Sequence, residues 1–90
     1  MYKTADILIF GRVQAVGYRF FAKRCADELN VTGCAQNLRD GTVKVVASGD
    51  EARLTLFIEK LREGPRWAIV KEVKVSWSDE NKIYDKFIIS

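Results

Sequence analysis

A short segment near the start of the chain carries residue types that could bind an anion. Residues 11–19 read GRVQAVGYR and follow an apolar run, just before a segment with helical periodicity. Free amides at a helix N-terminus and the helix dipole attract negative charge, and glycines let successive amides form a concave nest. The planar guanidinium of Arg19 can bind two phosphate oxygens. The spacing fits a phosphate-binding loop, but it fits a plain strand-to-helix connection with a surface arginine equally well.

The remaining side-chain chemistry is restricted, because the sequence contains no histidine. Ser-His and Cys-His couples and imidazole metal ligands are therefore excluded. Cys25 and Cys34 lack the spacing and the partners of a zinc site, and we expect both to be reduced, buried, small hydrophobic residues. The loop contains no cysteine beside Arg19 and matches no nucleotide-binding motif. The residues themselves indicate neither a zinc site nor a nucleotide-binding site.

Length and composition predict one soluble domain that spans residues 1–90. The chain is 48% hydrophobic and 30% charged, which is enough for a core and typical of globular proteins. Charges interrupt every apolar run well before the ~20 residues of a membrane span, and the N-terminus has no secretory signal pattern. The net charge of +3 is too small to indicate nucleic acid. We expect a cytoplasmic monomer without a nucleic-acid or membrane partner.

Hydrophobic periodicity then predicts the elements that position the loop. A compact apolar run favours a first strand, and apolar residues at helical spacing favour a helix directly after the loop. A second amphipathic stretch ends at Gly64-Pro65. In chain order, the expected elements are a strand at 5–10, a helix at 18–30, strands at 33–38 and 43–47, a helix that ends at 64, and strands at 70–77 and 84–89.

Turn and capping signals separate these elements. Asp40-Gly41 predicts a tight hairpin in which both residues have a positive φ. The second helix is expected to begin either with a capping box formed by Ser48 and Glu51 or with Asp50 as its N-cap. Residues 79–82 are predicted to form a turn.

The order β-α-β-β-α-β predicts a ferredoxin-like α+β sandwich. Two helices would cover one face of an antiparallel sheet, with a short C-terminal strand. Because βαβ crossovers are right-handed, the first two strands run the same way and leave room for the third between them. The loop at 11–19 and the end of the second strand near Asn37 are therefore expected to converge.

Two segments resemble the signatures of the acylphosphatase family. Residues 11–19 resemble G-x-V-Q-G-V-x-[FY]-R, and residues 33–43, GCAQNLRDGTV, resemble G-W-V-x-N-x-x-D-G-x-V. The resemblance covers nearly the whole chain, including its length and element order. It implies hydrolysis of acyl phosphates to a carboxylate and inorganic phosphate, without a metal or cofactor.

The resemblance also implies roles for particular residues. Arg19 would bind the phosphoryl group and Asn37 would hold the attacking water. Because no base stands in either motif, we expect the substrate phosphate itself to accept the proton of that water. The phosphate-binding cradle would consist of the backbone amides of Gln14, Ala15, Val16, Gly17, Tyr18 and Arg19.

Two departures from the family pattern leave an alternative open. Ala15 replaces a glycine, which costs roughly 1–2 kcal/mol if the position needs a left-handed φ. Cys34-Ala35 replaces Trp-Val, which changes packing beside Asn37. The alternative is a non-catalytic phosphate- or anion-binding interaction domain with the same fold. An RNA-binding module is disfavoured, because residues 42–47 carry no aromatic side chain for base stacking.

Several other side chains are expected to be structural. Arg12 and Arg39 are interpreted as solvated surface charges. Tyr18 should pack the loop down with its hydroxyl at the surface. We expect at least one of the residues at 20–21, both Phe, to lie in the core, with a substrate contact the less favoured role. Both tryptophans, at 67 and 77, are expected to pack.

Overall fold

The computed structural model describes residues 1–78 and 84–90, and seven elements follow one another in this part of the chain. The expected order is confirmed, although the first strand extends further at both ends and the last strand is shorter than predicted. The turn expected at 79–82 lies outside the described residues. The elements are β1 (Tyr2–Arg12), α1 (Tyr18–Leu29), β2 (Thr32–Asn37), β3 (Val43–Asp50), α2 (Glu51–Glu63), β4 (Ile69–Ser78) and β5 (Phe87–Ile89).

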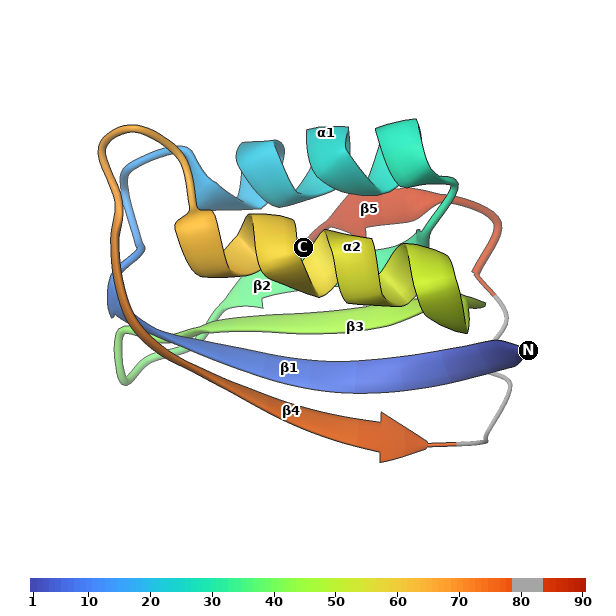
Figure 1. Cartoon of the computed structure of the whole chain (residues 1–90). Coiled ribbons are helices and arrows are strands. Elements are labelled where there is room, and N and C mark those ends of the chain that lie inside the picture. Colours follow the sequence, from blue (N-terminus) through green and yellow to red (C-terminus); the bar gives the residue numbers. More distant parts are fainter. Residues whose placement is uncertain (79–83) are drawn as a thin grey trace.

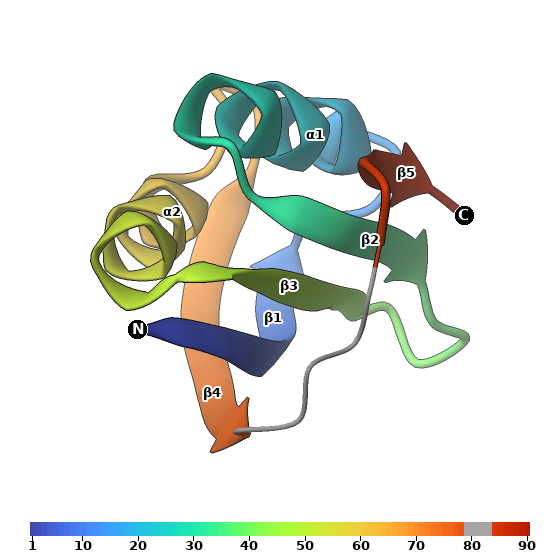
Figure 2. The ribbon, with the colours of Figure 1, turned by 90° about the vertical axis from the view of Figure 1, so that its right-hand side faces the viewer.

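The strands form one sheet in the order β4-β1-β3-β2-β5. Both helices lie on the same face of this sheet (Figures 1 and 2). The ferredoxin-like α+β fold is therefore confirmed, with β3 between β1 and β2 as expected. The first four strands pair antiparallel, whereas β5 pairs parallel with β2. The complete sheet is therefore mixed, and not antiparallel throughout.

The core lies between the sheet and the two helices. On β1 the alternating residues Ala5, Ile7 and Ile9 are fully buried, because every second side chain of a strand faces the same side. The apolar positions of α2 recur with helical spacing and face the sheet. They are Leu54, Phe57, Ile58 and Leu61.

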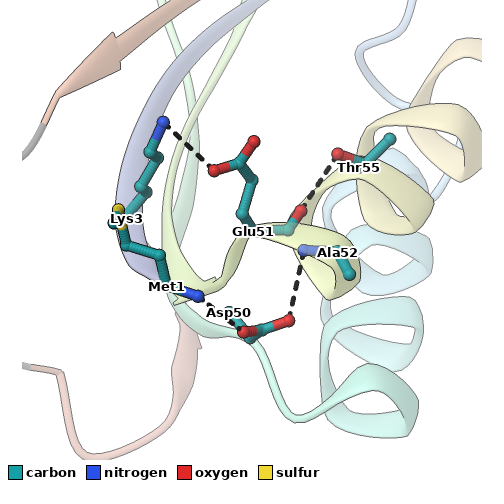
Figure 3. Close-up of polar contacts among 6 residues, drawn as sticks. All are labelled: Met1, Lys3, Asp50, Glu51, Ala52 and Thr55. Atoms are coloured by element: carbon teal, nitrogen blue, oxygen red, sulfur yellow. Dashed lines mark hydrogen bonds and ion pairs between the residues drawn. The ribbon is translucent and has the colours of Figure 1, made fainter.

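Asp50 begins α2. Its carboxylate accepts a hydrogen bond from the Ala52 amide at 3.2 Å and also faces the ammonium of Met1 at 3.2 Å (Figure 3). The hydrogen bond from that ammonium and its charge lower the pKa of the Asp50 carboxyl. The capping box with Ser48 is wrong, because the Ser48 hydroxyl is buried in β3 against the hydroxyl of Thr4, 2.8 Å away. The prediction of Asp50 as N-cap is confirmed.

The hairpin between β2 and β3 is confirmed, but its turn differs from the prediction. Of Asp40 and Gly41, only Gly41 has a positive φ, of 93°. The Gly41 amide donates to the Leu38 carbonyl, and the Leu38 amide donates to the Thr42 carbonyl. Three residues therefore close the loop, and in such hairpins only the last loop residue is left-handed. Asp40 instead accepts hydrogen bonds from the amide and hydroxyl of Thr42, which lower the pKa of its carboxyl.

The register brings two predicted site segments to one end of the sheet. Ile9 of β1 pairs with Val43 of β3, which in turn pairs with Asn37 of β2. The chain leaves β1 only three residues further on, after Arg12. The β1–α1 loop therefore emerges beside the end of β2, as the right-handed crossover predicts (Figure 1).

Candidate active site

The end of β1 directs the chain out of the sheet. The register between β1 and β4 shifts after Phe10, and Gly11 has a φ of 130°. A Cβ atom at Gly11 would overlap the carbonyl of Ile69 on β4. A glycine is therefore required here both for the backbone conformation and for the close approach of the neighbouring strand.

The loop that follows buries its valines and exposes its backbone. Val13 is almost fully buried, and Val16 packs against the core. Between and after them, Ala15 and Gly17 are exposed and left-handed, with φ of 59° and 77°. Alternation of left-handed with ordinary conformations is the backbone geometry in which successive amides form an anion-binding concavity. The apolar side chains thus anchor a loop whose intervening residues are exposed.

The backbone amides of residues 14–20 belong to the loop and to the first turn of α1. No described residue accepts a hydrogen bond from any of them, and the first helical amide with a backbone partner is that of Phe21, which donates to Gly17. Among the described residues, no side chain caps α1 at Gly17 and no acidic residue stands in its first turn. Unpaired donors at a helix N-terminus form an anion-binding site.

Arg19 and Asn37 border the same hollow as this loop. The hollow has a volume of about 100 Å³. Asn37 is exposed at the end of β2, and its side-chain amide makes no hydrogen bond to any described residue. The expected convergence of the loop with the Asn37 region is therefore confirmed. The lining residues are Val13, Ala15, Gly17, Tyr18, Arg19, Phe20 and Asn37.

Arg19 is held by Ser90, which directly follows β5. Its Nη1 donates to the backbone oxygen of Ser90 at 2.8 Å. The amide of Ser90 in turn donates to the Ala35 carbonyl of β2, also at 2.8 Å. The guanidinium is therefore oriented by the end of β5. Sequence reasoning missed Ser90, because no local pattern indicates a contact between residues this far apart.

Gln14 fixes the loop to the hairpin. Its Nε2 donates to the carbonyls of Leu38 at 2.7 Å and Thr42 at 2.9 Å. The sequence analysis gave Gln14 only a backbone role and so missed this contact. The available signal was chemical: a side-chain amide has two donors, and a glutamine within an otherwise small and apolar loop needs acceptors for both. The bonds keep the loop in register with the strand that carries Asn37.

Tyr18 is packed as expected, but its hydroxyl is not at the surface. The side chain is 1% exposed, and its hydroxyl donates to the carbonyl of Leu61 on α2 at 2.6 Å. Burial raises the pKa of the Tyr18 phenol well above its ordinary value, and the nearby Cys25 adds to the shift. The predicted surface hydroxyl is wrong because α2 passes directly over this position.

The other aromatic residues divide between packing and exposure. Phe21 is half-buried against Tyr18, with ring centroids 5.8 Å apart, so the expectation that one phenylalanine packs is confirmed. Phe20 is 70% exposed. The expectation of packed tryptophans is wrong, because Trp67 and Trp77 lie on the surface, 73% and 45% exposed. Each has a cation over its ring instead.

Other polar groups offer little further chemistry at this end of the molecule. Arg12 and Arg39 are exposed and do not line the hollow, as expected of surface charges. Cys25 is buried, and burial raises the pKa of its thiol, whereas Cys34 is only half-buried. Within residues 1–78 and 84–90, no three His, Cys, Asp or Glu side chains gather to hold a metal ion. No helix in that part of the chain is long and apolar enough to cross a membrane.

The fold and the loop define a class of small α+β domains that present helix-terminal amides and an arginine to an anion. Comparison with known proteins narrows this class. The family model for acylphosphatase matches residues 5–89. The chain therefore belongs to the acylphosphatase family, and it is a hydrolase of acyl phosphates. This activity is favoured over the alternative of a non-catalytic anion-binding domain.

Individual relatives agree with this assignment. The chain is 52% identical to an acylphosphatase of Thermus thermophilus over 81% of this chain and 83% of the relative. It is 42% identical to an acylphosphatase of Caldanaerobacter subterraneus over 99% of both chains. Among solved structures, the acylphosphatase of Bacillus subtilis superposes with a TM-score of 0.96 at 32% identity, over 100% of this chain and 99% of that one.

Proposed function

We propose that the phosphoryl group of an acyl phosphate binds in the hollow of the β1–α1 loop. Its oxygens would accept hydrogen bonds from the backbone amides of Gln14 to Arg19 and from the Arg19 guanidinium. The observation that carries the proposal is that these amides have no acceptor among the described residues while Arg19 and Asn37 border the same hollow. Preorganised donors of this kind stabilise the charge of a phosphoryl transition state.

Asn37 is proposed to hold the attacking water. Its amide carries a donor and an acceptor, neither of which is engaged by a described side chain. A water bound there can be directed at phosphorus from the β2 side of the hollow. Asn37 is not a base, so its contribution is orientation of the nucleophile and not removal of its proton.

The reaction then balances without a general acid or a protein base. The water oxygen bonds to phosphorus while the bond from phosphorus to the acyl oxygen breaks. The bonding pair leaves with the carboxylate, whose conjugate acid has a pKa of roughly 4, so it departs without a proton. The proton of the water passes to a phosphoryl oxygen of the substrate. The products are a carboxylate and inorganic phosphate, and no step in this scheme uses a metal or cofactor.

Hydrolysis of benzoyl phosphate in the presence of a chelator tests these roles. Arg19→Ala and Asn37→Ala should each lower kcat/KM by about 10²-fold or more. Arg19→Ala should also weaken the binding of inorganic phosphate, whereas Asn37→Ala should leave phosphate binding intact and lower kcat. Arg39→Ala removes an exposed cation outside the hollow and serves as the matched control.

Either of two results would contradict the proposal. If a folded Arg19→Ala variant kept full affinity for phosphate, Arg19 would not be a phosphate-binding residue. A folded Asn37→Ala variant with unchanged kcat would show that the water is held elsewhere. Circular dichroism on each variant separates these results from a loss of structure.

We also propose that residues 1–90 act as one domain, as a monomer in the cytoplasm. Both cysteines are free thiols, and a reducing compartment keeps them so. The exposed large apolar residues come from separate elements, including Leu56 of α2 and Ile88 of β5. Light scattering across a concentration series should give a mass near 10.3 kDa throughout. A mass that doubles with concentration would contradict the monomer.

A further inference from the structure

We propose that Phe20 contacts the acyl group of the substrate and selects for apolar acyl groups, with a preference for aromatic ones. The inference rests on the proposed binding of the phosphoryl group in the β1–α1 loop. It adds a determinant of substrate choice in a side chain that takes no part in holding the phosphate.

The first observation is the place of the Phe20 side chain. It follows Arg19 in the first turn of α1 and lines the loop hollow together with Arg19 and Asn37. It is nevertheless 70% exposed, so most of the residue is open to solvent. Single exposed apolar residues are common on protein surfaces. Phe20 differs from most of them because it lines the hollow of the candidate active site.

The second observation is a larger hollow that adjoins the first. It has a volume of about 480 Å³, and it shares Gly17 and Phe20 with the loop hollow. From there it extends along α1, where Phe21 and Pro65 add apolar surface. The acyl carbon of an acyl phosphate is separated from phosphorus by a single oxygen. An acyl group that leaves the loop hollow on this side therefore passes directly over the Phe20 ring.

The charges around the larger hollow do not favour an ionic acyl group. Its far end is lined by residues of both signs. Lys23 and Asp27 form an ion pair across one helical turn at 2.9 Å, and Arg24 and Glu28 follow on the same helix. Opposite charges in equal number give no net preference for an anion or a cation. The apolar surface of Phe20, Phe21 and Pro65 is then the main source of selectivity.

A comparison of two substrates tests this proposal. Wild type, Phe20→Ala and Phe20→Leu are assayed with benzoyl phosphate and with acetyl phosphate. Phe20→Ala should lower kcat/KM for benzoyl phosphate about three- to tenfold, mainly by raising KM, since an aromatic pair contributes that much beyond simple burial. The loss with acetyl phosphate should be less than twofold, because one methyl group reaches little of the ring. For benzoyl phosphate, the kcat/KM of Phe20→Leu should lie between those of wild type and Phe20→Ala.

Leu56→Ala is the matched control. Leu56 is also a large exposed apolar residue on a helix, 55% exposed, but it lines neither hollow. Its replacement should leave the ratio of the two kcat/KM values unchanged. If Phe20→Ala leaves the ratio of the two kcat/KM values unchanged, whether through no loss or through an equal loss with both substrates, the proposal is overturned.

This failure can be told apart from a failure of the proposed loop function. If Arg19→Ala and Asn37→Ala abolish hydrolysis while Phe20→Ala leaves the substrate ratio unchanged, only the acyl-group contact is wrong. If the Phe20 variants change the ratio while Arg19→Ala retains full activity, the acyl-group contact stands and the loop roles are wrong.

Discussion

At the candidate site, backbone groups outnumber side chains among the groups that could bind substrate. The backbone amides of residues 14–20 are the same chemical group whatever side chain each residue carries. Their position, however, depends on side chains elsewhere in the loop. The buried Val13 and the packed Val16 hold the loop against the core. Ala15 adopts a left-handed conformation that glycine adopts at lower energy. Ala15 is therefore the point where this loop carries strain.

We predict that Ala15→Gly stabilises the protein. Relief of the left-handed strain at φ 59° should raise the free energy of unfolding by about 1 kcal/mol and Tm by about 4–8 °C. Thermal unfolding measures the shift, and benzoyl phosphate hydrolysis shows whether kcat/KM rises with it. Asn30→Gly is the control. Asn30 is also left-handed, with a φ of 57°, but it lies at the end of α1, away from the loop. A Tm for Ala15→Gly below that of wild type would rule out strain at this position.

Tyr18 connects the two helices. The last carbonyls of a helix lack partners within the helix, and Tyr18 satisfies one of them by donating from α1 to Leu61 near the end of α2. The Gly64 amide satisfies another by donating to Lys60. The start of α1, where the amides face the hollow, is therefore fixed to the end of α2.

Replacement of the Tyr18 hydroxyl should destabilise the fold. Tyr18→Phe keeps the ring but leaves the buried carbonyl of Leu61 without a donor, so the free energy of unfolding should fall by about 1–3 kcal/mol. Urea unfolding at pH 7 measures the loss. Tyr2→Phe, at a residue that is 51% exposed, is the control and should change little. Equal stability of Tyr18→Phe and wild type would mean that water replaces the hydroxyl.

The same residue predicts a pH dependence. Burial raises the pKa of Tyr18 in the folded chain, so the unfolded chain loses this proton first as the pH rises past about 10. The stabilisation is complete below that pH and declines above it. Because Tyr18→Phe lacks this ionisation, the stability difference between the two proteins should shrink between pH 7 and pH 11. A difference that stays constant over this range would argue against the raised pKa.

Across the whole molecule, three distant segments contribute to the candidate site. The β1–α1 loop supplies the amides and Arg19, β2 supplies Asn37, and the end of β5 supplies the oxygen that orients Arg19. Arg19 and Ser90 are 71 residues apart in the chain. They meet because β5 pairs parallel with β2 at the sheet edge, with Ala35 opposite Ile89. Assembly of the site therefore requires that β5 pair with β2 at the edge of the sheet.

A variant that ends at Ile89 should lose part of its phosphate affinity. Without the backbone oxygen of Ser90, the Arg19 guanidinium has no fixed orientation, and we expect binding to weaken by roughly two- to tenfold. Titration with inorganic phosphate measures the change. Ser90→Gly keeps the amide and carbonyl and removes only the side chain, so it should bind as wild type does. A shortened, folded chain with unchanged affinity would show that Arg19 needs no support from β5.

The parts of the fold that could be predicted from the sequence rest on short-range patterns. Alternation on β1, helical spacing on α2 and the Asp40-Gly41 hairpin each reflect contacts within a few residues. The convergence of the loop with Asn37 was also predictable, because the handedness of the crossover leaves one arrangement. Local patterns did not decide which of two residues caps the second helix. Asp50, and not Ser48, caps α2 because the Ser48 hydroxyl is already paired with Thr4 across the sheet.

The amino-acid order fixed which residues are available to the site: a glycine-bearing loop, one arginine after it, and an asparagine at the end of the second strand. The tertiary structure decided how they are held. The Gln14 side chain reaches Leu38 and Thr42, the Tyr18 hydroxyl reaches Leu61, and Ser90 reaches Arg19. Each of these bonds joins groups brought together only when the helices pack on the sheet and β5 joins its edge. Their energies depend on separation in space, which no local pattern encodes.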